Sequence, residues 1–145
     1  MLDPSKGVAI FTDGSAYYKD RSGGWAYVLL DAFGASEVGS GHASDTTISR
    51  MELMAAIEGL EQVHEQHGPC DVLLYSDSKH VILGLVDKNR ARNKNKDLWF
   101  DLESAIDRHP YVEPNWIRGH ADSHWNHLAD ELAGNARKEG LNAET

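Results

Sequence analysis

The chain has 145 residues, a net charge of −9, 41% hydrophobic and 26% charged residues, and one cysteine, Cys70. These values fit a globular chain and exclude a disordered protein, a disulfide framework and a cysteine-based zinc finger. No apolar run approaches the roughly 20 residues that span a membrane, and the N-terminal segment has no apolar secretory core. We therefore expect a single domain over residues 1–145, ordered over about residues 7–138, monomeric and cytoplasmic.

The N-terminal part of the sequence predicts three strands. Residues 7–13 (GVAIFTD) are apolar and β-prone, and the Asp-Gly-Ser sequence at residues 13–15 is typical of a turn. Residues 25–30 predict a second strand after a glycine pair, and residues 35–42 predict a weaker third strand. The short connections favour an antiparallel meander.

The pattern becomes helical at residue 49. Apolar residues recur at helical spacing as far as residue 63, with Thr47 or Ser49 as the N-cap and Gly68 near the end. The continuous apolar run at residues 72–75 predicts a central strand that is covered on both faces.

The C-terminal half predicts helices alternating with a strand. We expect helices at residues 79–86, about 97–107 and about 123–138, and a strand at residues 111–117. Together with the meander, this order predicts an α/β fold with a mixed sheet. A right-handed crossover places the strand at residues 72–75 parallel to the first strand, and ligands of such sheets bind at the carboxyl ends of strands.

One basic run contrasts with the acidic composition. Residues 88–96 hold five of the 14 basic residues and no acidic residue. A solvated loop and a phosphate-binding patch both account for this run, and the run alone favours neither. The basic side chains are Lys88, Arg90, Arg92, Lys94 and Lys96.

Four acidic residues are candidates for a metal site. Asp13 and Asp77 end two strands that lie roughly 5 Å apart if they are neighbours, and such a pair needs a cation or a shared proton. Glu52 lies in the first turn of the connecting helix, and Asp130 lies beside an apolar face of the last helix. Turn chemistry and the helix dipole explain each acid singly, whereas an all-oxygen cluster would suit Mg²⁺ or Mn²⁺.

Short motifs around these acids occur in a characteristic order. They are Thr12-Asp13-Gly14-Ser15, the RMELMAAI sequence of residues 50–57, Ser76-Asp77-Ser78, Gly119-His120-Ala121 with Asn126, and the DELA sequence of residues 130–133. In order and spacing, they resemble the motifs of type 1 ribonuclease H from about residue 8 to residue 136. The resemblance implies a five-stranded mixed sheet, three strands antiparallel and two parallel, with helices on both faces.

The resemblance also implies an activity. A member of this family is an endonuclease that cuts the RNA strand of an RNA–DNA hybrid and leaves a 3′-hydroxyl and a 5′-phosphate. By the family's pattern, Asp13, Glu52, Asp77 and Asp130 hold two Mg²⁺ ions, with Mn²⁺ as an alternative. His120 matches a histidine that is assigned to proton transfer or product release.

Substrate contacts are likewise implied by the resemblance. Selectivity for RNA depends on its 2′-hydroxyl groups, which the family contacts through the backbone near Gly14 and at the start of the catalytic helix. Thr47 and Asn95 match positions that bind a phosphate of the DNA strand. The substrate-binding candidates are Gly14, Ser15, Lys19, Thr47, Ser49, Lys79, Asn95 and Asn126.

Several residues differ from the family's pattern at positions that affect substrate binding more than catalysis. The segment between Asp77 and Trp99 is short, so the basic handle of familiar bacterial enzymes is missing and the run at residues 88–96 is its candidate substitute. Lys19 stands where relatives often have Asn, and residues 48–49 (Ile-Ser) replace an Asn pair. Asp45 replaces a residue that is often basic.

Alternative interpretations remain at this point. His120, His124 and His127 could hold zinc, although surface histidines explain them better. Trp99 and Trp116 are expected in the core and not as surfaces that stack on bases, whereas Trp125, on the same loop as His120, is the candidate for base stacking. The same fold could also serve as a noncatalytic hybrid- or partner-binding domain, or as a nuclease of DNA junctions.

Overall fold

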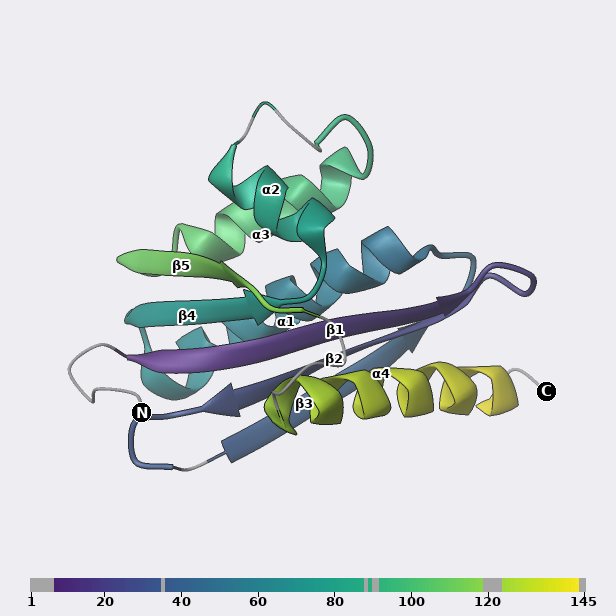
Figure 1. Cartoon of the computed structure of the whole chain (residues 1–145), viewed down its shortest axis with the longest axis horizontal. Coiled ribbons are helices and arrows are strands. Elements are labelled where there is room, and N and C mark those ends of the chain that lie inside the picture. Colours follow the sequence, from purple (N-terminus) through teal and green to yellow (C-terminus); the bar gives the residue numbers. More distant parts are fainter. Residues whose placement is uncertain (1–6, 35, 88, 90–91, 119–123, 144–145) are drawn as a thin grey trace.

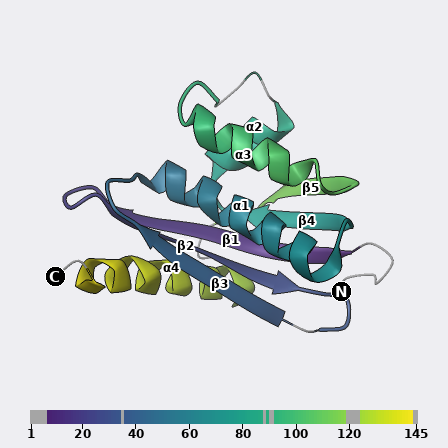
Figure 2. The same cartoon turned by 180° about the vertical axis from the view of Figure 1, so that it is seen from behind.

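The computed structural model describes residues 7–34, 36–87, 89, 92–118 and 124–143. A five-stranded sheet has the strand order β3-β2-β1-β4-β5, with α1 on one face and α4 on the other (Figures 1 and 2). Helices α2 and α3 lie together near the β5 edge, where α3 also packs against α1. The elements are β1 (Val8–Tyr17), β2 (Ser22–Leu30), β3 (Ser36–Ala43), α1 (Ile48–His67), β4 (Asp71–Ser76), α2 (Lys79–Val86), α3 (Lys96–Ile106), β5 (Tyr111–Trp116) and α4 (His124–Ala143).

The predicted strand pairing is confirmed. β1 is antiparallel to β2 and β2 is antiparallel to β3, whereas β1 and β4, and β4 and β5, are parallel. The crossover through α1 therefore brings β4 beside β1, as the right-handed rule requires. Thr47 is the N-cap of α1, and Gly68 ends the helix with a φ of 71°.

The prediction of a turn at residues 13–15 is wrong. β1 continues to Tyr17 because β2 pairs with it along its whole length, with Asp13 opposite Ala26 and Tyr17 opposite Ser22. The chain reverses after Tyr17, and Arg21 there has a φ of 57°. β1 thus extends past the end of β4, and Asp13 is held by a continuous strand instead of a loop.

The glycine pair at residues 23–24 lies inside β2 and not before it. A Cβ atom on Gly24 would lie 2.2 Å from the carbonyl oxygen of Ala133 in α4. The pair therefore permits close helix packing, which a pattern of turn residues does not distinguish from a chain break. The buried face of α4 has small residues, including Ala129 and Ala136, which suits the same approach.

The main core lies between the sheet and α1. Leu53, Leu60 and Val63 of the helix are buried with Ile10 and Leu74 of the central strands. The spacing of these helical residues is the pattern that predicted α1. Among the described helices, none has the length and apolar character to cross a membrane.

The two tryptophans predicted for the core have different environments. Trp99 is buried in the core cluster, as predicted. Trp116 is 43% exposed at the end of β5, so its prediction is wrong. The reason is its position at the last residue of an edge strand, where no further strand covers it.

Candidate active site

Three acidic side chains from separate elements meet at one edge of the sheet. Asp13 lies in β1, Glu52 near the start of α1, and Asp77 directly after β4. Each offers an oxygen atom that lies within 4.8 Å of the oxygens of the other two. Thr12 pairs with Ser76 in the parallel ladder, and this register sets Asp13 beside Asp77.

Gly14 allows the third acid to approach. A Cβ atom at this position would lie 2.6 Å from the backbone nitrogen of Glu52 and 2.7 Å from the carbonyl carbon of Met51. Only a glycine lets α1 start so close to β1. The buried backbone N–H of Gly14 also donates to Asp13 Oδ1 at 2.9 Å, which orients that carboxylate.

Both Asp13 and Glu52 are buried with unused hydrogen-bonding capacity. Asp13 is 3% exposed and Glu52 is 7% exposed. Asp13 Oδ2 and Glu52 Oε2 have no hydrogen-bond partner among the residues that the structure describes. Buried carboxylate oxygens are normally paired or bound to a cation, so these two are fitted to a ligand that carries positive charge.

The electrostatics of the cluster favour a bound cation. Burial first, and then the charge of Asp77, raise the pKa of Asp13 from its ordinary 3.8 to about 8. Burial and the charges of Asp13 and Asp77 raise the pKa of Glu52 well above its usual range. A divalent cation would remove this repulsion, and oxygen ligands suit Mg²⁺ or Mn²⁺.

Asp130 lies near the cluster but outside the group of three. Its carboxyl group, on α4, contributes to the raised pKa of Asp13. The packing of α4 across β1 and β2 brings it there. The structure therefore places the four predicted acids in one region. Helix α4, which carries Asp130, lies on the face of the sheet opposite α1 (Figure 1).

The histidine predictions are only partly covered by the structure. His120 lies outside the described residues, as do Gly119 and Ala121. His124 packs against the ring of Trp125 at a centroid distance of 4.8 Å. Within the described part of the chain, the acidic group is the one set of three side chains placed to hold a metal, and neither His124 nor His127 belongs to it.

The predicted substrate residues differ in accessibility. Ser15 and Ser49 are half-buried near the acids, and Lys19 and Lys79 are exposed. Gly14 is buried beneath the start of α1. Asn126 is 2% exposed, so its side chain belongs to the interior, which does not suit direct contact with substrate.

Arg92 differs from the rest of the basic run. Its guanidinium donates to the carbonyl oxygen of Gly84 at 2.8 Å and to Glu103 at 2.6 Å, and lies 4.6 Å from the centre of the Trp99 ring. Arg92 therefore anchors the segment between α2 and α3. Lys94 and Lys96 are exposed, whereas Lys88 and Arg90 lie outside the described residues.

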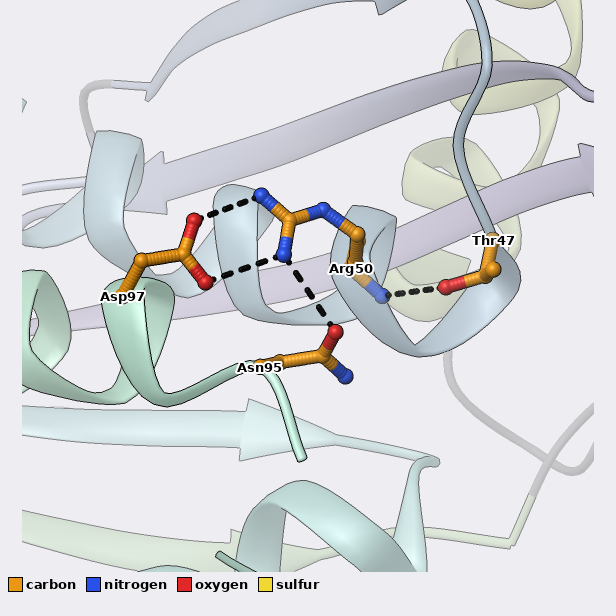
Figure 3. Close-up of polar contacts among 4 residues, drawn as sticks. All are labelled: Thr47, Arg50, Asn95 and Asp97. Carbon is orange, nitrogen blue, oxygen red and sulfur yellow. Dashed lines mark hydrogen bonds and ion pairs between the residues drawn. The ribbon is translucent and has the colours of Figure 1, made fainter. Parts of the chain in front are cut away.

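Two residues near the site had no functional prediction. The indole N–H of Trp116 donates to the carbonyl oxygen of Asp77 at 3.1 Å, and Lys79 Nζ lies 5.0 Å from the centre of its ring. Arg50 contacts Thr47, Asn95 and Asp97 (Figure 3). Sequence spacing does not reveal such contacts, because Arg50 and Asp97 are 47 positions apart.

Comparison with known proteins agrees with this geometry. The RNase H family model matches residues 5–138. Ribonuclease H of Oleidesulfovibrio alaskensis is 42% identical, covering 97% of each chain, and that of Pseudomonas fluorescens strain Pf-5 is 40% identical, covering 89% of this chain and 91% of the relative. LC11-RNase H1, solved in complex with an RNA/DNA hybrid, has the same fold, with a TM-score of 0.78, 22% identity, and coverage of 92% of this chain and 99% of that one. Because the family match spans most of its length, the chain belongs to the RNase H family.

Proposed function

We propose that this chain is an endonuclease that hydrolyses the RNA strand of RNA–DNA hybrids with two divalent metal ions. Membership in the family, and relatives named Ribonuclease H at about 40% identity, support nuclease activity on such hybrids. The hybrid bound to LC11-RNase H1 supports the same class of substrate.

One observation carries the metal-dependent part of the proposal. Asp13, Glu52 and Asp77 converge from three elements, and two buried oxygens among them have no partner in the described residues. A domain that only bound a polyanion would gain nothing from clustered carboxylates, which repel phosphate. The cluster therefore favours catalysis over the alternative of a noncatalytic binding domain.

The chain's own residues account for the arrangement that the reaction needs. Asp13, Glu52, Asp77 and Asp130 would hold the cations. When bound, a pair of divalent cations stabilises the attacking and leaving oxygens of an in-line displacement. Water adds to the scissile phosphorus and the bond from phosphorus to the 3′-oxygen breaks, which leaves a 3′-hydroxyl and a 5′-phosphate. We assign His120 to proton transfer or product release, as the family resemblance implies.

The decisive experiment uses an RNA–DNA hybrid labelled on the RNA strand. We expect cleavage with Mg²⁺ or Mn²⁺, no cleavage with EDTA, and no cleavage of RNA–RNA or DNA–DNA duplexes. Asp13→Asn should abolish cleavage, because an amide neither carries the charge nor replaces the carboxylate as a cation ligand. Asp101→Asn is the matched control, since Asp101 is exposed on α3 and does not belong to the acidic group.

Two results would contradict the proposal. Hybrid binding without cleavage in either metal would assign the chain to the noncatalytic alternative. Undiminished cleavage by Asp13→Asn would remove the acidic group from the mechanism. Sequencing of the cut ends separately tests the predicted 3′-hydroxyl and 5′-phosphate.

A further inference from the structure

Arg50 connects the start of α1 to the start of α3, two residues before Glu52. Its guanidinium donates to both carboxylate oxygens of Asp97, at 3.0 and 2.7 Å (Figure 3). The same Nη1 atom donates to Asn95 Oδ1 at 3.3 Å. At the other end of the residue, the backbone N–H of Arg50 donates to Thr47 Oγ1 at 3.3 Å.

The charge of Arg50 is already matched by Asp97. The two-point contact raises the pKa of Arg50, and the Arg50 guanidinium lowers the pKa of Asp97 to about 2. A guanidinium held in this way by a carboxylate is a poor partner for an incoming phosphate. The arrangement suits a residue that orients its neighbours instead of binding substrate itself.

Asn95 has two features that its local structure does not require. It is the N-cap of α3, yet its side chain makes no capping hydrogen bond, which is the usual reason for Asn at this position. Its backbone is in the left-handed region, with a φ of 59° and a ψ of 38°. This conformation costs free energy for a residue with a side chain, although Asn tolerates it better than most. The side chain is directed to Arg50 instead of to its own helix.

The contact with Arg50 determines which end of the Asn95 amide is presented outward. A guanidinium can only donate, so the amide oxygen must face it and the Nδ2 group must face away (Figure 3). No described residue accepts a hydrogen bond from Asn95 Nδ2. Thr47 Oγ1 accepts the Arg50 backbone N–H, which leaves the hydroxyl proton of exposed Thr47 available to donate.

We propose that Arg50 is a positioning residue for one phosphate of the DNA strand, acting through the side-chain contact that orients Asn95 beside Thr47. Asn95 Nδ2 and the Thr47 hydroxyl are then uncharged donors to that phosphate. The inference rests on the proposed function, because the ligand is the DNA strand of the hybrid. It assigns a role to Arg50 that the match of Thr47 and Asn95 to the family did not include.

A set of hybrids with one uncharged methylphosphonate at each successive DNA linkage tests this role. For the unaltered chain, we expect one linkage at which the substitution raises KM about tenfold with little change in kcat, the size of a lost hydrogen bond to a charged group. Arg50→Ala and Asn95→Ala should each raise KM about tenfold on the unmodified hybrid. In these variants, a methylphosphonate at that linkage should raise KM no further. Because the Asn95 donor is uncharged, Asn95→Ala should not change the dependence of affinity on salt concentration.

Arg108→Ala is the matched control. Arg108 follows α3 and pairs with Glu61 of α1 at 2.7 Å, so this variant also removes an ion pair between an arginine and a carboxylate. We expect it to keep the KM of the unaltered chain and its sensitivity at the one linkage. A loss in this control equal to that in Arg50→Ala would show that Arg50 acts only on stability, and would overturn the proposal.

Other results would overturn it as well. One is an Arg50→Ala variant whose KM still rises about tenfold when the methylphosphonate is at that linkage. Another is a fall in kcat, instead of a rise in KM, in Arg50→Ala. A third is tighter binding with a steeper salt dependence in Asp97→Asn. The last result would mean that Arg50 itself binds phosphate once Asp97 releases it.

Two further measurements keep the outcome clear. Asn95→Asp retains an acceptor for Arg50 but has no Nδ2 group, so a methylphosphonate at that linkage should not raise its KM further. This variant can be measured even if Arg50→Ala does not fold. If the unaltered chain cuts no hybrid, the proposed function fails, and the affinities of the same hybrids by fluorescence anisotropy still test Arg50 alone.

Discussion

The carboxyl group of Asp13 has an environment that is unfavourable for its own charge. Its pKa of about 8 results first from burial and second from the charge of Asp77. Between about pH 4 and pH 8, the folded metal-free chain keeps a proton on Asp13 that the unfolded chain has lost. The free energy of unfolding of the metal-free protein therefore falls as the pH rises through this range, as far as Asp13 contributes.

A divalent cation should reverse this pH dependence. It competes with the Asp13 proton, so its affinity should rise with pH and its binding should stabilise the fold. We expect Mg²⁺ to raise Tm more at about pH 8 than at about pH 6, measured by calorimetry. Asp13→Asn should remove most of this increase and raise the stability of the metal-free protein by about 1–3 kcal/mol at pH 8. An equal Mg²⁺ effect in Asp13→Asn would contradict the assignment.

Trp116 holds the backbone at Asp77 from the neighbouring strand. Trp116→Phe keeps an aromatic ring beneath Lys79 but removes the N–H that donates to the Asp77 carbonyl oxygen. A neutral hydrogen bond contributes about 0.5–1.5 kcal/mol, so we expect a fall in kcat of about two- to tenfold with KM nearly unchanged. Steady-state kinetics check this, and an unchanged kcat would leave Trp116 without a positioning role.

At the scale of elements, the approach of α1 to β1 assembles the site. Gly14→Ala places a Cβ atom against the backbone at Met51 and Glu52, so α1 must move and carry Glu52 away from Asp13. We expect a loss of about 1–3 kcal/mol in stability from overpacking. Activity should fall about 100-fold, the effect of a displacement of roughly 1 Å.

Gly134→Ala is the control for this variant. Nothing lies within 4 Å of a Cβ atom at Gly134, so alanine should stabilise α4 slightly and leave cleavage unchanged. Urea denaturation and cleavage rates distinguish the two variants. If Gly14→Ala cuts as well as Gly134→Ala, the close approach of α1 is not required.

At the scale of the whole molecule, a chain with a net charge of −9 must bind a polyanion. Lys94 and Lys96 are the exposed, described members of the basic run, and each phosphate contact by a lysine contributes about one unit to the salt dependence of affinity. We therefore expect Lys94→Gln with Lys96→Gln to lower the slope of log affinity against log salt by about two.

Arg92→Ala should behave differently, because the guanidinium is tied to Gly84, Glu103 and Trp99. It should lower Tm and leave the salt slope nearly unchanged. Binding titrations at several salt concentrations test both variants. If the two lysine substitutions leave the slope of log affinity against log salt unchanged, the basic run is an ordinary solvated loop and not a phosphate-binding patch.

Much of the fold was predictable because periodicity records which residues are buried. The spacing of Leu53, Leu60 and Val63 predicted α1, and the order of elements predicted the parallel crossover. The apolar run at residues 72–75 predicted the position of β4, but its expected burial on both faces is wrong, because Leu73 and Tyr75 are only half-buried. The candidate acids were also predictable, because Asp13 and Asp77 lie near adjacent positions of neighbouring strands.

What the tertiary structure alone decided concerns contacts between distant segments. The neighbouring sequence does not distinguish a glycine in a turn from a glycine in a strand that a helix packs against. Only the packing of α1 and α4 on the sheet showed that Gly14 and Gly24 lie inside strands. Likewise, the burial of Asn126, the exposure of Trp116 and the anchoring of Arg92 depend on which elements cover them. The sequence by itself determined most of the elements and their order, because these depend on local pattern, and it indicated the acids through the motifs that resemble the family. Their distances, burial and partners depend on how the elements pack, which no single segment encodes.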